Sequence, residues 1–436
     1  MSYKDAPPLA IYNARELGTG RMIVLGMQHT FAMFGATVLV PLLTGLNVST
    51  TLLMAGLGTL LFHFITKRKV PAFLGSSFAF LGGYAAVAPM IDGAPNTEML
   101  PYACGGVAVA GLLYVIVSLL FSAFGAKRVM RFFPPVVTGP IIISIGLILA
   151  PSAIANCSTN WLLAIVALVT IVICNIWGRG MIRIIPIMMG IIVSYIVALI
   201  TGAVDFSGVT STLSNGFVGG IVGLPVQSSG FAKFDISAIL TIAPIAIATM
   251  MEHIGDISAI GATTERNFIA DPGLHRTLLG DGLATTLSAV FGGPANTTYG
   301  ENTGVLALSR VYDPAVIRIA AVFAIILSFF PTFAEVIRSI PAGIIGGVSL
   351  ILYGMISAIG IRNVVENQVD FTNSRNLIIA AVILVCALGF NFSDLGGITF
   401  SVAGTSITLS GLAIASIAGI VLNAILPGNT YEFKEN

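Results

Sequence analysis

Three acidic residues lie in stretches that are otherwise apolar, and their side chains could do chemistry there. Glu252 and Asp256 are four residues apart, which puts both carboxylates on one face of a helix. Glu301 follows in a segment rich in Gly, Thr and Asn. A carboxylate accepts hydrogen bonds from a polar ligand and can take up and release a proton. The three acids are therefore candidates for ligand binding and proton coupling, with capping or pairing between helices as the structural alternative.

The composition places these acids in a membrane protein. Of the 436 residues, 56% are hydrophobic and only 9% are charged, against about 25% charged in an average soluble domain; the mean hydropathy is +0.97. A carboxylate at the bilayer centre costs about 2.5–3.5 kcal/mol on insertion scales, so an acid kept there indicates a functional site. The net charge of +1 argues against nucleic acid as a partner. The 4 scattered cysteines indicate neither a disulfide framework nor a metal site.

Apolar segments divide the chain into fourteen candidate spans, each near the roughly 20 residues that a membrane helix needs. The expected limits are 22–43, 50–66, 71–91, 102–125, 133–151, 160–178, 182–203, 238–262, 276–292, 295–310, 314–333, 341–358, 376–391 and 407–426. Residues 22–203 and 238–426 thus hold seven spans each, joined by a polar, Gly/Ser-rich linker at 204–237. Because seven is odd, a duplicated unit would cross the membrane in opposite directions. We expect an all-α membrane protein built from two inverted seven-span repeats.

The basic residues predict the orientation of these spans. Of the 20 Lys and Arg residues, all but Lys233 and Arg338 fall on one side of the expected membrane. Positive charge concentrates in cytoplasmic loops. We therefore expect cytoplasmic tails at 1–21 and 427–436, and an extracytoplasmic linker.

Two spans, 71–91 and 295–310, are interrupted. Both crowd Gly, Ser, Thr or Asn where a spanning helix should be apolar. Extended backbone at membrane depth is tolerated only where it faces protein or a wet cavity. A half-helix that begins after such backbone aims free N–H groups at the cavity. Matching interruptions predict the substrate site of a transporter; ordinary outer loops joined to short spans are the alternative.

Other polar residues in the spans are harder to assign. Gln28 and His29 in the first span are expected to support the site, although His29 could equally be a core histidine. His253 lies about 100° around a helix from Glu252 and is expected to pack behind it. The pattern predicts no role for Asp281. Metalloprotease, ATP-binding and serine hydrolase motifs are absent from the sequence, which disfavours an enzyme; a channel or an anion carrier stays an alternative.

Residues 296–304, Asn-Thr-Thr-Tyr-Gly-Glu-Asn-Thr-Gly, with Arg310 beyond them, resemble the signature of the nucleobase/ascorbate transporter family, in its uracil permease branch. Further matches run in order from about residue 20 to 390, at Gln28-His29, Phe31–Thr37, Leu74–Phe80, Glu252–Gly255, Asp271–Arg276 and Gly346–Ser349. The resemblance implies a core domain of spans 1–4 and 8–11 and a gate domain of spans 5–7 and 12–14. It also implies proton-coupled uracil import across a bacterial inner (plasma) membrane, no cofactor, and a lipid-embedded homodimer formed through the gate domains.

The resemblance also implies roles for individual residues. Glu252 and Glu301 would accept hydrogen bonds from ring N–H groups of uracil, and the backbone N–H groups of Phe78 and Gly300 would donate to ring carbonyls. Both acids and Asp256 would take part in proton coupling. Residues implied to line or support the site are Tyr299, Tyr353, Ser77, Asn302, His29 and Gln28.

Two positions depart from the pattern of the uracil branch. Ser309 stands where the signature usually has Thr, which keeps the hydroxyl. Asp256 stands where uracil permeases typically carry His, whereas Asp is common in the xanthine and urate branches; Glu301 points the other way, because purine branches often have Gln there. Xanthine or another purine therefore stays an alternative substrate, and sodium an alternative coupling ion.

Overall fold

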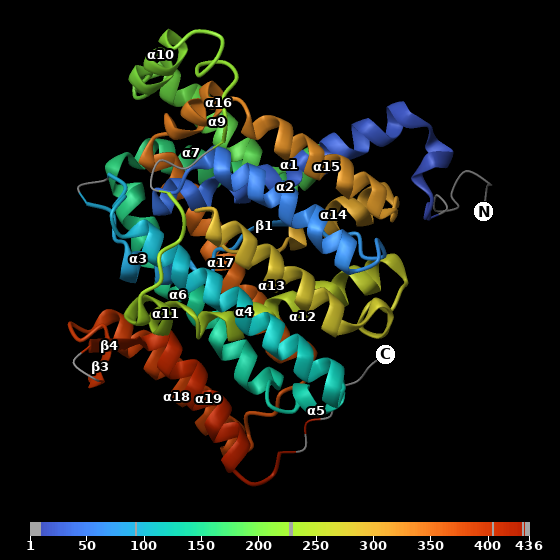
Figure 1. Cartoon of the computed structure of the whole chain (residues 1–436), viewed down its shortest axis with the longest axis vertical. Coiled ribbons are helices and arrows are strands. Elements are labelled where there is room, and N and C mark those ends of the chain that lie inside the picture. Colours follow the sequence, from blue (N-terminus) through green and yellow to red (C-terminus); the bar gives the residue numbers. More distant parts are fainter. Residues whose placement is uncertain (1–9, 92–93, 226–229, 403–404, 430, 432–436) are drawn as a thin grey trace.

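The computed structural model of the chain describes residues 10–91, 94–225, 230–402, 405–429 and 431, and most of these residues are helical (Figure 1). Up to the linker, the helices are η1 (Ala14–Leu17), α1 (Thr19–Thr44), α2 (Val48–Ile65), α3 (Leu81–Val87), α4 (Leu100–Phe124), α5 (Ala126–Met130), α6 (Pro135–Thr159), α7 (Trp161–Ile176), α8 (Met181–Ile184) and α9 (Pro186–Ile200). From the linker onward they are α10 (Ser207–Ser214), α11 (Ile236–Ile242), α12 (Ile245–Thr264), η2 (Ile269–Gly273), α13 (Leu274–Val290), α14 (Gly300–Ser309), α15 (Pro314–Ser328), α16 (Pro331–Arg338), α17 (Ala342–Glu366), α18 (Ser374–Phe392) and α19 (Gly411–Ile425).

Seven helical segments in the described part of the chain are long and apolar enough to cross a membrane. An eighth results if α15 and α16, which meet at 89°, are counted as one broken span. Shorter apolar helices, such as α7, α9 and α19, fall below this length. The chain is therefore a multi-pass membrane protein, and the number fourteen stays a prediction because several expected spans are short or interrupted.

Both interrupted spans contain a short strand, as their composition predicts. β1 (Leu74–Ser76) and β2 (Asn296–Thr298) come from opposite halves of the chain and pair antiparallel, with Gly75 opposite Thr297. Two further backbone bonds extend this pairing, Ser77 N–H to the Ala295 carbonyl at 2.9 Å and Tyr299 N–H to the Phe73 carbonyl at 3.0 Å. All six strand residues are buried. The pairing satisfies backbone groups that lipid could not, and it brings the two interruptions together near the centre of the molecule (Figure 1).

The helices pack in two groups. In one, α2 packs against α13 and α15, and α13 packs against α4; in the other, α6 packs against α17 and α18, and α18 against α19. The α6–α17 contact is very close, because a Cβ atom on Gly146 would lie 2.2 Å from the Tyr353 carbonyl oxygen. A Cβ on Gly360 would likewise lie 2.6 Å from the Ile143 nitrogen. Only glycine permits this approach, as is common between membrane helices. Figure 1 places α18 and α19 at the far end of the molecule from α1, α2 and α15.

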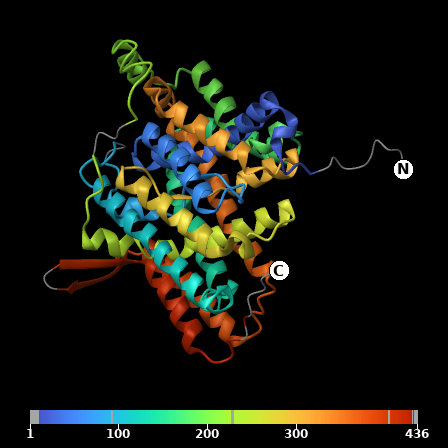
Figure 2. The same cartoon turned by 45° about the vertical axis from the view of Figure 1, so that its right-hand side comes forward.

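The all-α expectation is wrong between α18 and α19. β3 (Gly397–Val402) and β4 (Thr405–Ser410) form an antiparallel hairpin that projects from the helices (Figure 2). The span expected at 407–426 therefore begins too early, since α19 starts only at Gly411. Alternating Ile398 and Phe400, followed by Thr and Ile residues, are typical of strands. Hydropathy alone did not distinguish the apolar residues of this hairpin from those of the last span.

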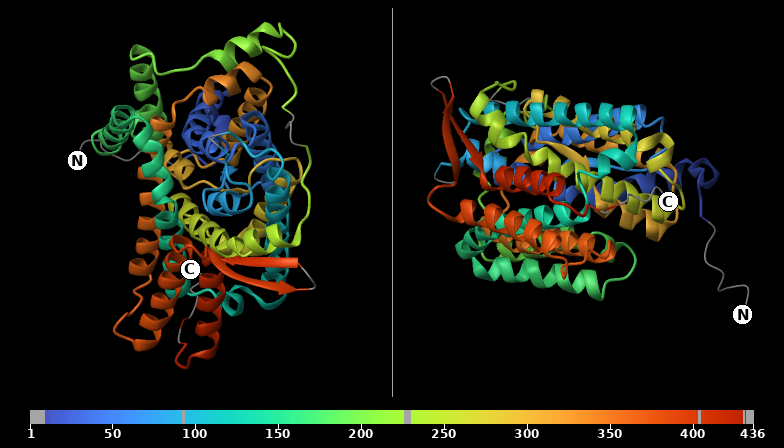
Figure 3. Two further views of the ribbon diagram at one scale, coloured as in Figure 1. Left: turned by 90° about the vertical axis from the view of Figure 1, so that its left-hand side faces the viewer. Right: turned by 90° about the horizontal axis from the view of Figure 1, so that it is seen from below.

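The linker and the fifth span also differ from expectation. The linker contains α10 and packs on α16, with a hydrogen bond from Gly223 N–H to the Phe329 carbonyl at 2.9 Å and one from the Thr332 hydroxyl to the Gly220 carbonyl at 2.8 Å. Figure 3 shows the linker running along one edge of the molecule. The span expected at 133–151 ends too early, because α6 continues past Pro151 to Thr159.

Candidate functional site

The candidate site is built around the start of α14. This helix begins at Gly300, immediately after β2, so its first backbone N–H groups have no partner within the helix. Such an end carries partial positive charge. On the other side of the strand pair, Phe78 lies in the turn between β1 and α3, and its carbonyl accepts a hydrogen bond from Leu81 N–H at 3.0 Å. The strand pair thus places both positions expected to offer backbone N–H groups, Phe78 and Gly300, at the ends of paired strands.

The acids of α12 face this helix start. The Thr298 hydroxyl donates a 2.9 Å hydrogen bond to Asp256 Oδ2, and Asp256 Oδ1 would lie 3.5 Å from a Cβ atom on Gly300. Glu252 lies one helical turn earlier on α12, and Glu301 is the second residue of α14. The structure therefore brings the sequence-predicted acids to the same end of the strand pair.

All three acids are half-buried rather than sealed in the core. Within the described residues, the Glu252 and Glu301 carboxylates accept no hydrogen bond from another side chain. A carboxylate without a partner is costly inside a membrane, so an acid kept there indicates a functional role. The carboxylates of Glu252 and Glu301 can therefore accept a polar ligand or a proton.

A cavity of about 460 Å³ opens beside Glu301, between the two helix groups. Its walls come from α1, α14, α7, α8, α9 and α17, and most of its lining is apolar. The polar side chains in its wall are Glu301, Asn175 and Arg183. A mostly apolar cavity with a few polar groups is the usual form of a small-molecule site.

The two tyrosines belong to different parts of the fold, Tyr299 to the junction of β2 and α14 and Tyr353 to α17. The Tyr299 hydroxyl donates to the Ser76 carbonyl at 2.9 Å and lies 3.3 Å from the Thr37 hydroxyl. Its ring covers Gly75, where a Cβ would come within 2.5 Å of the ring. Tyr299 therefore connects the strand pair to α1. Tyr353 is buried on α17, in the other helix group.

The supporting residues expected from the sequence fall in different places. Asn302 Nδ2 donates to the His29 carbonyl at 3.2 Å and lies 3.2 Å from His29 Nδ1, which joins α14 to α1. Ser77 is buried beside the strand pair, and its hydroxyl has no partner among the described residues. Gln28 is half-buried on α1, next to His29. His29 and Asn302 thus act together, whereas Gln28 has no comparable contact in the described part.

One polar pair was missed by the sequence reasoning. His253 Nδ1 lies 3.1 Å from Asp281 Oδ2, and both side chains are completely buried between α12 and α13. His253 Nδ1 also lies 3.5 Å from the Thr298 hydroxyl, which in turn donates to Asp256. The signal in the sequence was Gly280-Asp281-Gly282, where both glycines permit close packing of α13. A Cβ at Gly280 would collide with the Phe62 ring on α2, and one at Gly282 with the Tyr114 Cβ and the Gly111 carbonyl on α4.

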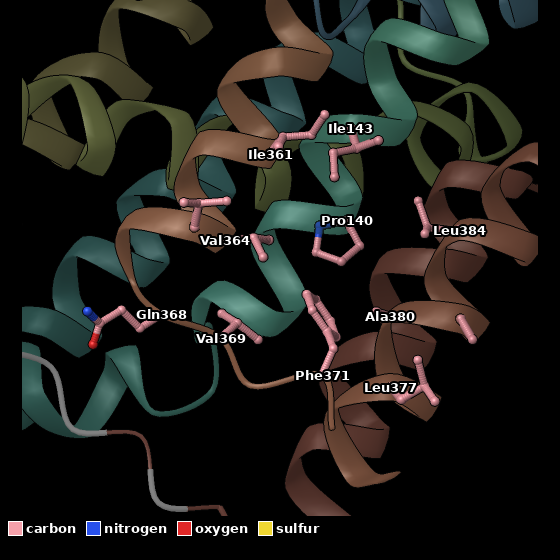
Figure 4. Close-up of a pocket in the computed structure, with 12 residues that line it drawn as sticks. Pro140, Ile143, Ile361, Val364, Gln368, Val369, Phe371, Leu377, Ala380 and Leu384 are labelled. Atoms are coloured by element: carbon pink, nitrogen blue, oxygen red, sulfur yellow. The ribbon is translucent and has the colours of Figure 1, made fainter. Parts of the chain in front are cut away.

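No group of three or more His, Cys, Asp or Glu side chains suited to a metal ion occurs in the part of the chain that the structure describes. A second cavity, of about 660 Å³, lies between α6, α17 and α18 (Figure 4). Its wall is apolar except for Gln368, and it lacks the acids. It therefore offers a polar ligand only the amide of Gln368.

A family model described as the Permease family, and named for xanthine and uracil permeases, matches residues 20–396. The chain belongs to this permease family. The permease is 42% identical over 434 residues to the uracil permease of Bacillus caldolyticus, covering 96% of this chain and 95% of that protein. It is 39% identical over 422 residues to the uracil permease of Bacillus subtilis (strain 168), covering 93% and 92%. It is also 39% identical over 414 residues to the putative pyrimidine permease RutG of Escherichia coli (strain K12), covering 92% and 89%.

These relatives confirm the family resemblance and show that the chain is a permease rather than an enzyme. Solved structures confirm the type of fold. The transmembrane domain of the cyanobacterial bicarbonate transporter BicA superposes with a TM-score of 0.62 at 14% identity, covering 88% of this permease and 98% of that chain. SLC26A9 superposes with a TM-score of 0.65 at 11% identity, covering 95% and 66%. At these identities the likeness concerns the fold alone.

Proposed function

We propose that this permease imports uracil together with protons. The observation that carries the proposal is the placement of the acids at the start of α14: Glu301 is the second residue of this helix, Asp256 lies beside Gly300, and Glu252 lies one helical turn before Asp256 on α12. The carboxylates of Glu252 and Glu301 have no side-chain partners among the described residues. Uracil is flat and neutral and presents ring N–H donors beside carbonyl acceptors. Carboxylates and backbone N–H groups match this pattern. The uracil permeases that share about two-fifths of its residues support the same substrate.

In the proposed complex, Glu252 and Glu301 accept hydrogen bonds from the ring N–H groups. The backbone N–H groups of Phe78 and Gly300 donate to the ring carbonyls, and Tyr353 closes the site from α17. Each partner left unpaired in such a buried site would cost about 1–3 kcal/mol. This penalty would reject analogues that lack one N–H or carbonyl group.

Proton coupling is assigned to the same acids. Glu301, Glu252 or Asp256 would bind a proton from the outside and release it to the cytoplasm after the site reorients. Because uracil is neutral, one co-transported proton moves one positive charge inward, which a membrane potential favours by about 2.3 kcal/mol per 100 mV. No cofactor is needed for this cycle, and sodium is the competing coupling ion.

The architecture fits alternating access. We assign α1–α4 and α11–α16 to a core domain and α6–α9 and α17–α19 to a gate domain, together forming fourteen spans in two inverted repeats. Relative movement of the two domains would expose the site to each side in turn. Both termini would be cytoplasmic in the plasma membrane, and two copies would associate through their gate domains.

Uptake by purified permease in sealed lipid vesicles tests the substrate and the ion together. With sodium removed and a pH gradient imposed, labelled uracil should accumulate, and excess unlabelled uracil should compete better than xanthine. Accumulation of xanthine with uracil inert would replace the substrate by a purine. Uracil uptake that requires sodium and ignores the pH gradient would replace the coupling ion.

A further inference from the structure

The segment before α1 is folded back onto the helices that carry the acids. Residues 10–17, here called the amino-terminal clasp, include η1 and lie on the side of the molecule where α12, α14 and the start of α15 meet (Figure 1). The segment belongs to none of these helices. Its contacts with them are specific and involve both backbone and side chains.

The clasp first binds the loop between α14 and α15. Ile11 N–H donates to the Arg310 carbonyl at 2.9 Å, and Tyr312 N–H donates to the Ile11 carbonyl at 2.8 Å. These bonds form a parallel bridge between Ile11 and Val311. The backbone N–H of Ala14, a completely buried residue, donates to Asp313 Oδ2 at 2.8 Å. The clasp is therefore fixed to the C-terminal end of α14.

Tyr12 reaches from this bridge to the end of α12. Its hydroxyl donates to the Thr264 carbonyl at 2.9 Å, in the last turn of the helix. The Arg266 guanidinium lies over the Tyr12 ring, 4.4 Å from its centroid, and the Tyr312 ring meets it edge-on at 5.5 Å. A cation over a tyrosine face and a bonded helix carbonyl both hold a side chain in one place. Tyr12 thus joins the end of α12 to the end of α14.

Both joined helices run directly to the candidate site. Asp256 lies eight residues before Thr264 on α12, and Glu301 lies nine residues before Arg310 on α14. At 1.5 Å per residue, the clasp is about 12–14 Å from these acids along each helix axis. Helices are stiff over this length, so a change in separation at one end is transmitted to the other.

We propose that the amino-terminal clasp sets the distance between α12 and α14 at the site, and that Tyr12 is a positioning residue for substrate binding. Loss of the Tyr12 contacts allows the two helix ends to separate. Glu252 and Glu301 can then no longer bind the same uracil ring at the same time. The proposal rests on the proposed function for its ligand, while the geometry it invokes exists without ligand.

The test compares uracil binding by detergent-purified variants of the full chain. Tyr12→Ala should raise the dissociation constant for uracil by about three- to tenfold, at unchanged abundance and unchanged maximal uptake rate once uracil is saturating. Tyr12→Phe, which keeps the ring over Arg266 and loses only the hydroxyl, should give a smaller increase. A merely structural role would lower abundance and maximal rate together and leave the dissociation constant unchanged.

A matched control removes the same kind of contact elsewhere. Tyr102 on α4 also has a cation over its ring, Lys233 at 5.5 Å, and it touches neither helix end. Tyr102→Ala should bind uracil as the wild type does. Ile11→Pro, which deletes the N–H donor to Arg310, gives a second route to loosening the clasp if Tyr12→Ala folds poorly.

A measurement without ligand separates the two proposals. Spin labels near the ends of α12 and α14 should show one narrow distance in the wild type and a longer or broader one in Tyr12→Ala. If the wild type binds no uracil, the substrate proposal is overturned. The proposal about the clasp is then tested by the distance measurement. Unchanged distance, or dissociation constants for Tyr12→Ala and Ile11→Pro within twofold of the wild type, would overturn the clasp.

Discussion

The Thr298 hydroxyl on β2 donates a 2.9 Å hydrogen bond to Asp256 on α12, and it also lies 3.5 Å from His253 Nδ1. One strand residue thereby connects an acid of the candidate site to the buried pair of His253 and Asp281. The connection links three elements, β2, α12 and α13. It explains why substitutions behind the site should alter its behaviour.

Glu301→Gln should abolish the accumulation of uracil against its gradient. The amide keeps the size of the side chain and cannot take up and release a proton. Proton-driven uptake into vesicles is the measurement, and Glu335→Gln, which changes an acid paired with Arg338 on α16, is the matched control. Full accumulation by Glu301→Gln would remove this residue from the coupling mechanism.

Asp256→His should change the pH profile of uptake or the ranking of competing bases. A carboxylate accepts hydrogen bonds, whereas histidine can both donate and accept. The two readouts are initial uptake rate across a pH series and inhibition by xanthine and uracil. Thr298→Val, which removes the hydroxyl donor from Asp256 while keeping the side chain's shape, should shift the same readouts more weakly. If both readouts stay unchanged in Asp256→His, the position is structural.

Asp281→Ala should destabilise the permease. It leaves the His253 side chain buried without the carboxylate that it contacts, and an unsatisfied buried polar group costs about 1–3 kcal/mol. Thermal unfolding in detergent should show a Tm lower by roughly 1–3 °C. Asp281→Asn retains an oxygen that can accept from His253 and should lose much less. Equal Tm values for Asp281→Ala and the wild type would mean that the pair contributes nothing to stability.

Asp271 provides a pH test outside the membrane spans. A hydrogen bond from Lys69, together with the charges of Lys69 and Lys67, holds the pKa of Asp271 below its ordinary value. A carboxyl group whose pKa is lowered by folding stabilises the folded state above its unfolded pKa of about 3.9, and this contribution is lost as the pH falls below that value. Asp271→Asn should therefore lower the Tm slightly at pH 7, and the difference should vanish as the pH falls below about 3.9 and through the lowered pKa of Asp271.

Because both side chains are exposed, the change in Tm should be only about 1 °C. Lys69→Met should remove the same increment, and the double variant should lose no more than either single one. A difference that persists in acid after the Asp271 carboxyl group has been protonated would contradict the assignment to this ion pair.

Much of the site could be predicted because charge is rare in this chain. Glu252, Asp256 and Glu301 were conspicuous in apolar surroundings, and the crowding of small polar residues located β1 and β2. The pairing register of these strands could not be predicted, since it depends on how α2, α13 and α14 pack around them. Three-residue strands carry too little pattern to specify a partner.

The pair of His253 and Asp281 was not predicted from the sequence, for a related reason. Helical periodicity showed that His253 points away from Glu252, but it could not show which helix fills that side. The clasp was not predicted because residues 10–17 lie outside any span and mix apolar residues with Asn13, Arg15 and Glu16. Its order comes from partners on α12 and in the α14–α15 loop, which no local pattern reveals.

The pairing of β1 with β2 also imposes an order on biosynthesis. β1 is made and inserted long before its partner strand leaves the ribosome, and unpaired backbone in lipid is costly. The Thr59 side chain, available from the start, bonds both the N–H and the carbonyl of Leu74, at 2.9 and 3.1 Å. The Thr59 hydroxyl on α2 is therefore positioned to satisfy backbone groups of β1 until β2 has been synthesised. Because each half of the chain contributes one strand, neither half can form the candidate site alone.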